Sequence, residues 1–87
     1  MYLHLGQSVV VPFWDVMGVF DLDNASSSHI TRAFLQRAEK EGRVVNVSDD
    51  LPKSFAVCKS KNGEPTIYLS QLASSTLLKR VEENSFE

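Results

Sequence analysis

The chain has 87 residues, of which 43 % are hydrophobic and 23 % are charged, and its formal net charge is −2 at pH 7. These values are typical of one small globular domain and exclude a multidomain chain. A single cysteine excludes an internal disulfide and a zinc site built from thiolates. No apolar run approaches the ~20 residues that span a bilayer, so we expect a soluble protein with no membrane partner.

The small size of the chain favours self-association. A domain this short buries only about 60 % of the surface that its unfolded chain exposes. Disulfides, metals or oligomerisation commonly supply the missing stability, and the single cysteine leaves oligomerisation as the expected source. Residues 1–5 lack the basic start and small-residue cleavage site of a signal peptide, which predicts a cytoplasmic location.

The first 22 residues predict three strands. Residues 2–5 form a short strand, and the β-branched run 9–11 predicts a buried one. Residues 14–22 are again rich in valine and aromatic side chains and predict a third strand. Gly18 lies inside this third strand and indicates a bend, a bulge or a close backbone approach.

The segment 29–41 predicts the central helix. Ser27 or Ser28 can cap its first turn, and Gly42 stands at its C-terminal end. Helical spacing places its apolar residues on one stripe, made of Ile30, Phe34 and Ala38. The polar side chains of this helix fall on the opposite, solvated side.

The second half of the chain predicts three further strands. Residues 43–47 form the first of them, before a loop that contains Asp49-Asp50. Residues 54–59 and 66–69 form a hairpin around Asn62-Gly63, because this dipeptide is the strongest short-range hairpin signal in the chain.

Ser74 or Ser75 can cap a short last helix that carries Leu77, Leu78 and Val81. We therefore predict an α+β fold: a small, mostly antiparallel sheet with one central helix and a short C-terminal helix. A single domain over residues 1–82 and a frayed tail over residues 83–87 complete the expected organisation.

No residue pattern points to catalysis, a metal or a cofactor. His4 and His29 are too far apart for a metal motif, and Cys58 alternates with apolar neighbours as a packed thiol does. Residues 21–24 resemble the start of a calcium loop but lack its glycine and its final glutamate. Neither a Gly-x-Ser-x-Gly elbow nor a phosphate-binding glycine loop is present, so we expect a protein that is not an enzyme.

Basic residues offer two open interpretations. Three lie in or beside the predicted hairpin and four on or just after the central helix: Lys53, Lys59 and Lys61, and Arg32, Arg37, Lys40 and Arg43. They can form an ordinary solvated surface of mixed charge, or they can contact nucleic-acid phosphates. One protomer has too few cations for tight phosphate binding, whereas a ring would repeat each of them.

Four stretches of the sequence carry a resemblance that runs from residue 1 to about residue 80. They are Met1-Tyr2-Leu3-His4-Leu5-Gly6, Gly18-Val19-Phe20-Asp21, Pro52-Lys53-Ser54-Phe55, and Tyr68-Leu69-Ser70 with Ser74-Ser75-Thr76-Leu77-Leu78-Lys79-Arg80. In order and spacing they resemble the small bacterial extracellular matrix regulatory family, RemA and RemB, and RemB more closely.

This resemblance implies a cytoplasmic protein, because members of the family are small cytoplasmic proteins. The RemA branch assembles into a closed ring of eight subunits and binds DNA through arginines, activating biofilm-matrix operons. The first of these arginine positions falls here at Trp14-Asp15, which offers no cation. The adjacent pair falls in the loop 49–53, where Lys53 stands beside two aspartates.

Two hypotheses follow. In the first, the chain is a DNA-binding transcriptional regulator that acts as a symmetric homo-oligomer. Its candidate phosphate contacts are Lys53, Arg32, Arg43, Lys59 and Lys61, and its candidate subunit contacts are Phe13, Trp14, Leu77 and Leu78. In the second, the same oligomer has lost direct DNA binding and acts through a protein partner or a RemA-like sister subunit. Trp14 could also stack against bases, although an interface role is favoured.

Overall fold

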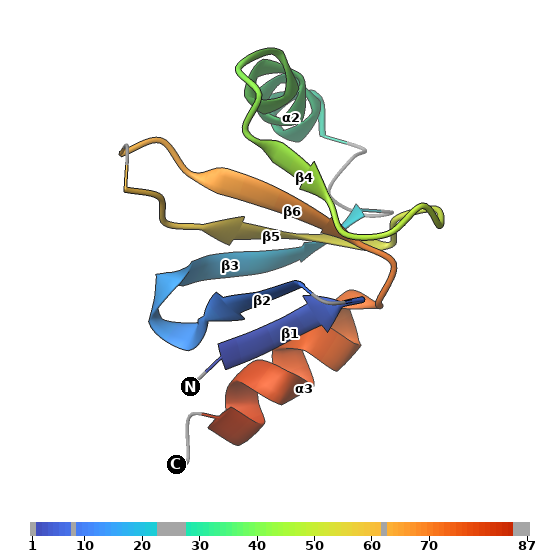
Figure 1. The fold of residues 1–87 in the computed structure, drawn as a ribbon. Helices are drawn as coiled ribbons and strands as arrows, with labels where there is room; N and C mark the ends of the chain where they lie inside the picture. Colours follow the sequence, from blue (N-terminus) through green and yellow to red (C-terminus); the bar gives the residue numbers. More distant parts are fainter. Residues whose placement is uncertain (1, 8, 23–27, 62, 85–87) are drawn as a thin grey trace.

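The computed structural model describes residues 2–7, 9–22, 28–61 and 63–84 (Figure 1). The strands within these ranges are β1 (Tyr2–Gly6), β2 (Val9–Pro12), β3 (Val16–Asp21), β4 (Val44–Asn46), β5 (Ser54–Cys58) and β6 (Thr66–Ser70). The helices are the 3₁₀ turn η1 (Phe13–Asp15), α2 (His29–Lys40) and α3 (Ser74–Asn84). The prediction of an α+β fold is confirmed.

The strands divide into two sheets. Strands β1 and β2 pair antiparallel, and the other four strands form a sheet of order β3-β5-β6-β4. Within the larger sheet, β5 pairs antiparallel with both neighbours, whereas β4 pairs parallel with β6. The strand pairing is mostly antiparallel, as predicted, but the strands form two sheets instead of one, and β4 pairs parallel at an edge. Helix α2 carries the chain across the sheet, so β4 arrives at the far edge running in the same direction as β6.

The predicted third strand begins later than expected. Residues 13–15 form the 3₁₀ turn that leads from the β1–β2 hairpin into β3. The register of β3 on β5 shifts between Val16 and Gly18, which confirms the irregularity predicted at Gly18. A Cβ atom at Gly18 would stand 2.9 Å from Cε2 of Phe20. A side chain at this position would force the half-exposed Phe20 ring, which lies back over the strand, to move.

The predicted helix end and hairpin are confirmed. Gly42 follows α2 with a φ of +72°, in the left-handed region that glycine favours at a helix C-terminus. Ser28 occupies the N-cap position but makes no side-chain capping hydrogen bond, and Ser27 lies outside the described residues. Cys58 pairs with Thr66, so residues 59–65 form a connection longer than a two-residue turn. Asn62 in this connection also lies outside the described residues.

Core side chains lie on both faces of the larger sheet. The β1–β2 hairpin and α3 cover one face, where the buried residues include Leu3, Leu5, Val11, Ala56, Cys58 and Leu77. Helix α2 covers the other face over β4 and β6, where Ala38 packs with Phe55 and Ile67. On this second face α2 leaves β3 uncovered, and Met17 and Phe20 of that strand are 67 % and 45 % exposed.

Two buried serines tie the larger sheet to its neighbours, one to the β1–β2 hairpin and one to the segment before α3. The Ser70 hydroxyl donates to the carbonyl of Leu5 at 2.7 Å, which ties β6 to the end of β1. The Ser54 hydroxyl donates to the carbonyl of Leu72 at 2.8 Å, at the approach to α3. Both serines are fully buried, and a buried hydroxyl is tolerated only with such a partner.

Leu77 and Leu78 provide a matched pair for testing this packing. We expect Leu77→Ala to lower the free energy of unfolding by about 2–5 kcal/mol, because Leu77 is fully buried in the core. Leu78 is 45 % exposed, so Leu78→Ala should cost less than about 1 kcal/mol. Urea denaturation followed by circular dichroism measures both values, and equal losses would contradict the assigned packing of α3.

Candidate nucleic-acid interface

The predicted phosphate contacts do not gather at one place. Lys53 directly precedes β5 and Lys59 directly follows it, so their backbones are separated by about 20 Å along the strand. Both lysines are exposed, as is Lys61 in the β5–β6 connection. Lys53 shares its loop with Asp49 and Asp50, which are also exposed. Each end of β5 therefore offers separate lysines and not one positive patch.

Arg43 has a structural role that takes it out of the candidate set. Its guanidinium donates from Nη1 to the carbonyl of Pro65 at 2.6 Å and from Nη2 to Oε1 of Glu41 at 2.6 Å. Only 14 % of its side chain is exposed. The prediction that Arg43 contacts phosphate therefore does not fit this geometry, because its donors already join the start of β4 to the β5–β6 connection. Its hydrogen bonds also lower the pKa of the Glu41 carboxyl.

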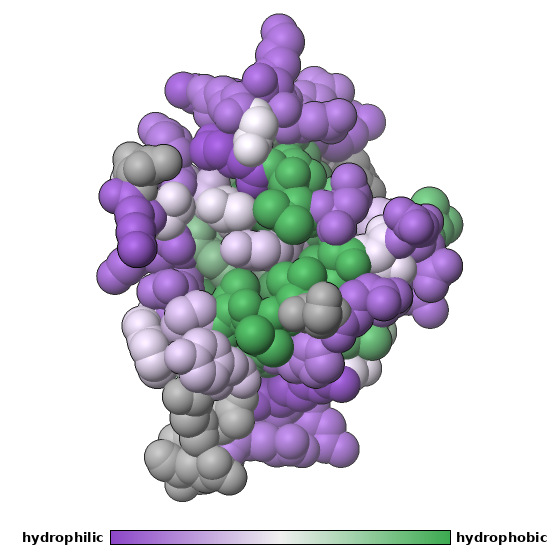
Figure 2. Space-filling model, in the orientation of Figure 1, coloured by the Kyte–Doolittle hydropathy of each residue, from purple (hydrophilic) through white to green (hydrophobic). Residues whose placement is uncertain are grey.

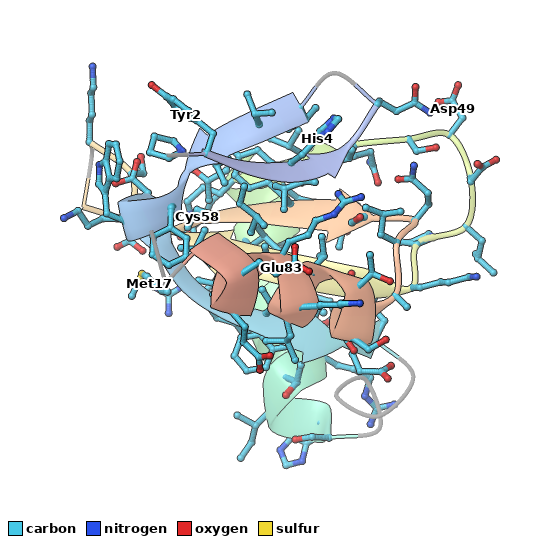
Figure 3. All side chains as sticks on the ribbon, turned by 90° about the horizontal axis from the view of Figure 1, so that it is seen from below. Tyr2, His4, Met17, Asp49, Cys58 and Glu83 are labelled. Carbon is cyan, nitrogen blue, oxygen red and sulfur yellow. The ribbon has the colours of Figure 1, made fainter. Side chains whose placement is uncertain are left out.

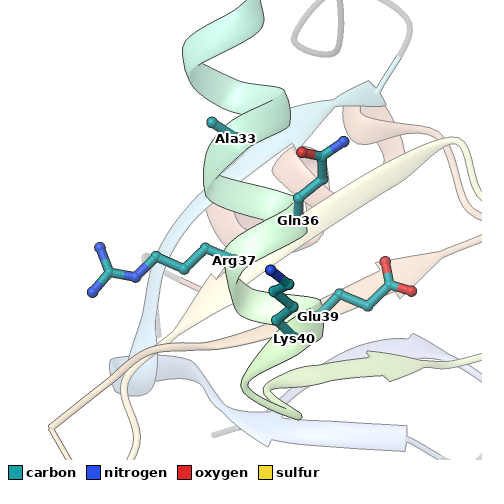
Figure 4. Close-up of a pocket in the computed structure, with 5 residues that line it drawn as sticks. All are labelled: Ala33, Gln36, Arg37, Glu39 and Lys40. Carbon is teal, nitrogen blue, oxygen red and sulfur yellow. The ribbon is translucent and has the colours of Figure 1, made fainter.

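A basic surface lies on the outer face of α2. Arg32, Arg37 and Lys40 are all exposed there, with Gln36 between them. Positions 32, 36 and 40 follow the four-residue spacing of one helix face, and position 37, three residues before 40, lies at its edge toward Ile30 and Phe34. The close-up in Figure 4 shows Arg37 extending to one side of the helix and Gln36 to the other, with Lys40 between them and the carboxylate of Glu39 on the same side as Gln36. We call Arg32, Gln36, Arg37 and Lys40 the basic face of α2.

Arg37 and Lys40 were named among the basic residues of the predicted helix, but not among the candidate phosphate contacts. The signal was present for Lys40, because helical spacing places it away from the apolar stripe, whereas Arg37 follows Phe34 by three residues and borders that stripe. Arg37 forms only a loose ion pair, in which its Nε stands 3.5 Å from Oε2 of Glu41 and 75 % of its side chain is exposed. Unlike Arg43, it keeps donors that can contact another molecule.

Some of the candidate subunit contacts are exposed on the protomer and one is buried in its core. Trp14 is 65 % exposed and packs against Tyr2, with 6.2 Å between ring centroids, while Phe13 is half-buried. Leu78 is exposed, but Leu77 is fully buried within its own protomer. The two positions are adjacent on α3, and the helix turns about 100° between them. Leu77 therefore belongs to the core of the protomer, and its prediction as an interface residue is corrected.

Two comparisons with known proteins bear on these residues. The family model of extracellular matrix regulatory protein A-like (RemA-like) proteins matches residues 2–81. Extracellular matrix regulatory protein B of Bacillus subtilis strain 168 is 39 % identical over 82 residues, which cover 94 % of this chain and 91 % of that protein. The chain belongs to the RemA-like family. The resemblance found in the sequence is thereby confirmed, and the named relative is a regulatory protein.

Among the described residues of this RemA-like chain, the side chains that could bind a metal ion are not clustered. The described residues contain no group of three His, Cys, Asp or Glu side chains placed to hold a metal ion. No helix in the described ranges is long and apolar enough to cross a membrane. His4 lies on β1, where its Nε2 stands 2.7 Å from the carbonyl oxygen of Gln7 (Figure 3).

Cys58 should be inert toward thiol reagents in the folded protein. Burial, with a smaller contribution from the charge of Asp15, raises the pKa of its thiol to about 11. At mildly alkaline pH the reactive thiolate is then at least about a hundredfold scarcer than for a free cysteine. We expect Ellman's reagent to label the native chain at least that much more slowly than the chain unfolded in guanidinium chloride. Equal rates would show that Cys58 reaches solvent.

Proposed function

We propose that this RemA-like protein is a DNA-binding transcriptional regulator that acts in the cytoplasm as a symmetric homo-oligomer. The observation that carries the proposal is the basic face of α2, where three cations and an amide side chain are exposed together. Arginine, lysine and glutamine are side chains that commonly contact phosphate oxygens. Figure 2 shows the hydrophilic surface of α2 at the top of the molecule, above a more apolar region over the strands.

A symmetric oligomer would compensate for the small number of exposed cations on each protomer. One protomer carries a net charge of −2 and offers only a few exposed cations on α2, with Lys53, Lys59 and Lys61 at the ends of β5. A symmetric oligomer presents the same face of α2 several times to one duplex, so weak contacts add within a single binding event. Such binding is led by charge and shape, because phosphate contacts carry no sequence information of their own.

The alternative function is a protein-interaction module of the same oligomeric design. The observation that favours it is the exposed Asp49-Asp50 pair beside Lys53, since neighbouring carboxylates weaken phosphate binding at that loop. In this alternative, the chain contacts a protein or a RemA-like sister subunit. Both functions need binding surfaces and neither needs a catalytic group or a cofactor.

Fluorescence anisotropy of a labelled DNA duplex, measured over a salt series, tests the first proposal. We expect affinity to fall steeply with added salt, because binding releases counterions from the phosphates. Lys40→Ala should weaken binding about uniformly across DNA sequences and reduce the salt dependence. Lys79→Ala on α3 is the matched control, because it removes the same charge from an exposed site at the other end of the molecule (Figure 1).

Equal losses in the two variants would show that total charge matters and the basic face of α2 does not. Lys53→Ala serves as a third variant and reports whether the loop position implied by the family resemblance contributes. Binding that is absent at low salt would overturn the DNA proposal. A pull-down that then yields a protein partner would support the alternative function.

A further inference from the structure

Two aromatic side chains project from the molecule where β1 begins and β2 ends. Tyr2 opens β1 and Trp14 lies in η1, and the two residues are 63 % and 65 % exposed. Their ring centroids are 6.2 Å apart and their planes are inclined by 50°. The two rings therefore contact each other on one side and leave their other faces open to solvent. We call Tyr2 and Trp14 the aromatic pair.

The backbone holds the aromatic pair in place. Tyr2 pairs with Pro12 in the β1–β2 sheet, directly before η1. On the far side of this turn, the N–H of Lys59 donates to the carbonyl of Asp15 at 2.7 Å. Trp14 stands between these two backbone anchors, so a ligand that binds there needs little further ordering of the chain.

Two lysines accompany the aromatic pair. Lys59 is bonded through its backbone to the residue that follows Trp14, and Lys61 stands two positions later in the β5–β6 connection. Both lysines are exposed. In Figure 1 this connection, the start of β1 and the turn between β2 and β3 lie on the same side of the molecule. Aromatic rings and cations are therefore presented together on one side.

Two carboxylates on the same segments reduce the positive potential there. Asp15 is half-buried beside Trp14 in η1. Oε2 of Glu64 stands 3.9 Å from Nη2 of Arg43, whose charge offsets part of that carboxylate. The surface is thus only weakly cationic. A ligand must gain most of its affinity there from the rings and less from the charge.

This combination of side chains indicates the class of ligand. Proteins that bind single-stranded nucleic acid use aromatic rings on which bases stack, beside cations that contact the phosphates. Lysine is depleted from interfaces between proteins, so the same surface fits a protein partner less well. In a duplex the bases are already stacked on one another, and only unpaired bases present a free face to an aromatic side chain.

We propose that the aromatic pair, together with Lys59 and Lys61, binds the unpaired bases of single-stranded nucleic acid. Bases stack on the open faces of Trp14 and Tyr2, and the two lysines contact the phosphates that join them. Figure 3 shows Tyr2 and its hairpin on the opposite side of the larger sheet from α2, so this site is separate from the basic face of α2. It goes beyond the proposed function, because contacts of α2 to duplex phosphates need no unpaired base.

Trp14 is the one tryptophan of the chain and reports on stacking by its fluorescence. The probe is an oligothymidylate of about twelve nucleotides, and an abasic strand of equal length and charge is the control. We expect the oligothymidylate to quench Trp14 emission and to bind about tenfold or more tightly than the abasic strand. An oligouridylate of equal length distinguishes RNA from DNA as the source of the bases. Equal affinity for the two DNA strands, or unchanged emission, would overturn the proposal.

Substitution of Trp14 tests the ring itself. Trp14→Ala should weaken binding of the oligothymidylate about tenfold or more and leave binding of the abasic strand unchanged, while Trp14→Phe should restore most of the loss. Leu51→Ala is the matched control, because it removes an apolar side chain from a position that is 85 % exposed. Circular dichroism and native mass verify the fold and assembly of each variant. A changed mass in Trp14→Ala would assign the ring to a subunit contact and overturn the proposal.

The lysines are tested by the salt dependence of single-strand binding. Lys59→Ala and Lys61→Ala should each reduce the slope of log affinity against log salt concentration by about 0.7, because each removes one phosphate contact. Lys40→Ala on α2 is the control and should leave this slope unchanged. An equal effect of all three substitutions would show that total charge governs binding and would overturn the assigned site.

The outcome also separates this site from the proposed function. Single-strand binding without duplex binding would refute only the proposed function. Duplex binding that depends on Lys40, with no binding of the oligothymidylate, would refute only the site at the aromatic pair.

Discussion

The fold depends on β5, the strand that has side chains buried against both faces of the larger sheet. Phe55 contributes to the core beneath α2, while Ala56 and Cys58 contribute to the core beneath the β1–β2 hairpin and α3. The hydroxyl of Ser54 bonds the segment before α3, so the same strand also holds the C-terminal helix. A central strand of this kind makes the two helices and the hairpin parts of one cooperative unit.

A consequence of this arrangement is that the sheet is only half covered on the α2 side. In the described part of this 87-residue chain, α2 is the helix that packs on this face, and it lies over β4 and β6. Met17 and Phe20 of β3 therefore stay exposed. Ile30 and Phe34 border this exposed surface and lie on a different side of α2 from Lys40, whereas Arg37 is two turns after Ile30 and lies on its side.

The distribution of charge is governed by position in the fold more than by composition. Arg43 and Lys40 are close in sequence, but Arg43 is held by Glu41 and the carbonyl of Pro65, while Lys40 faces solvent. Although the net charge of the chain is negative, one helix therefore carries a small basic surface. Of the arginine positions implied by the family resemblance, the loop keeps only Lys53, and the exposed cations on α2 carry more of the proposed DNA contact.

Local spacing in the sequence was enough to predict α2, its end at Gly42, the β5–β6 hairpin, the irregularity at Gly18 and the family. These features depend on side chains a few residues apart, whose effects on the backbone are short-range. Local spacing could not predict the parallel pairing of β4 or the hydrogen bonds that hold Arg43. It also could not predict the burial of Leu77 beside an exposed Leu78, or the apolar surface that β3, β5 and α2 form together. Each of them is decided by contacts between residues distant in the chain, and only tertiary packing determines which side of an amphipathic element is covered.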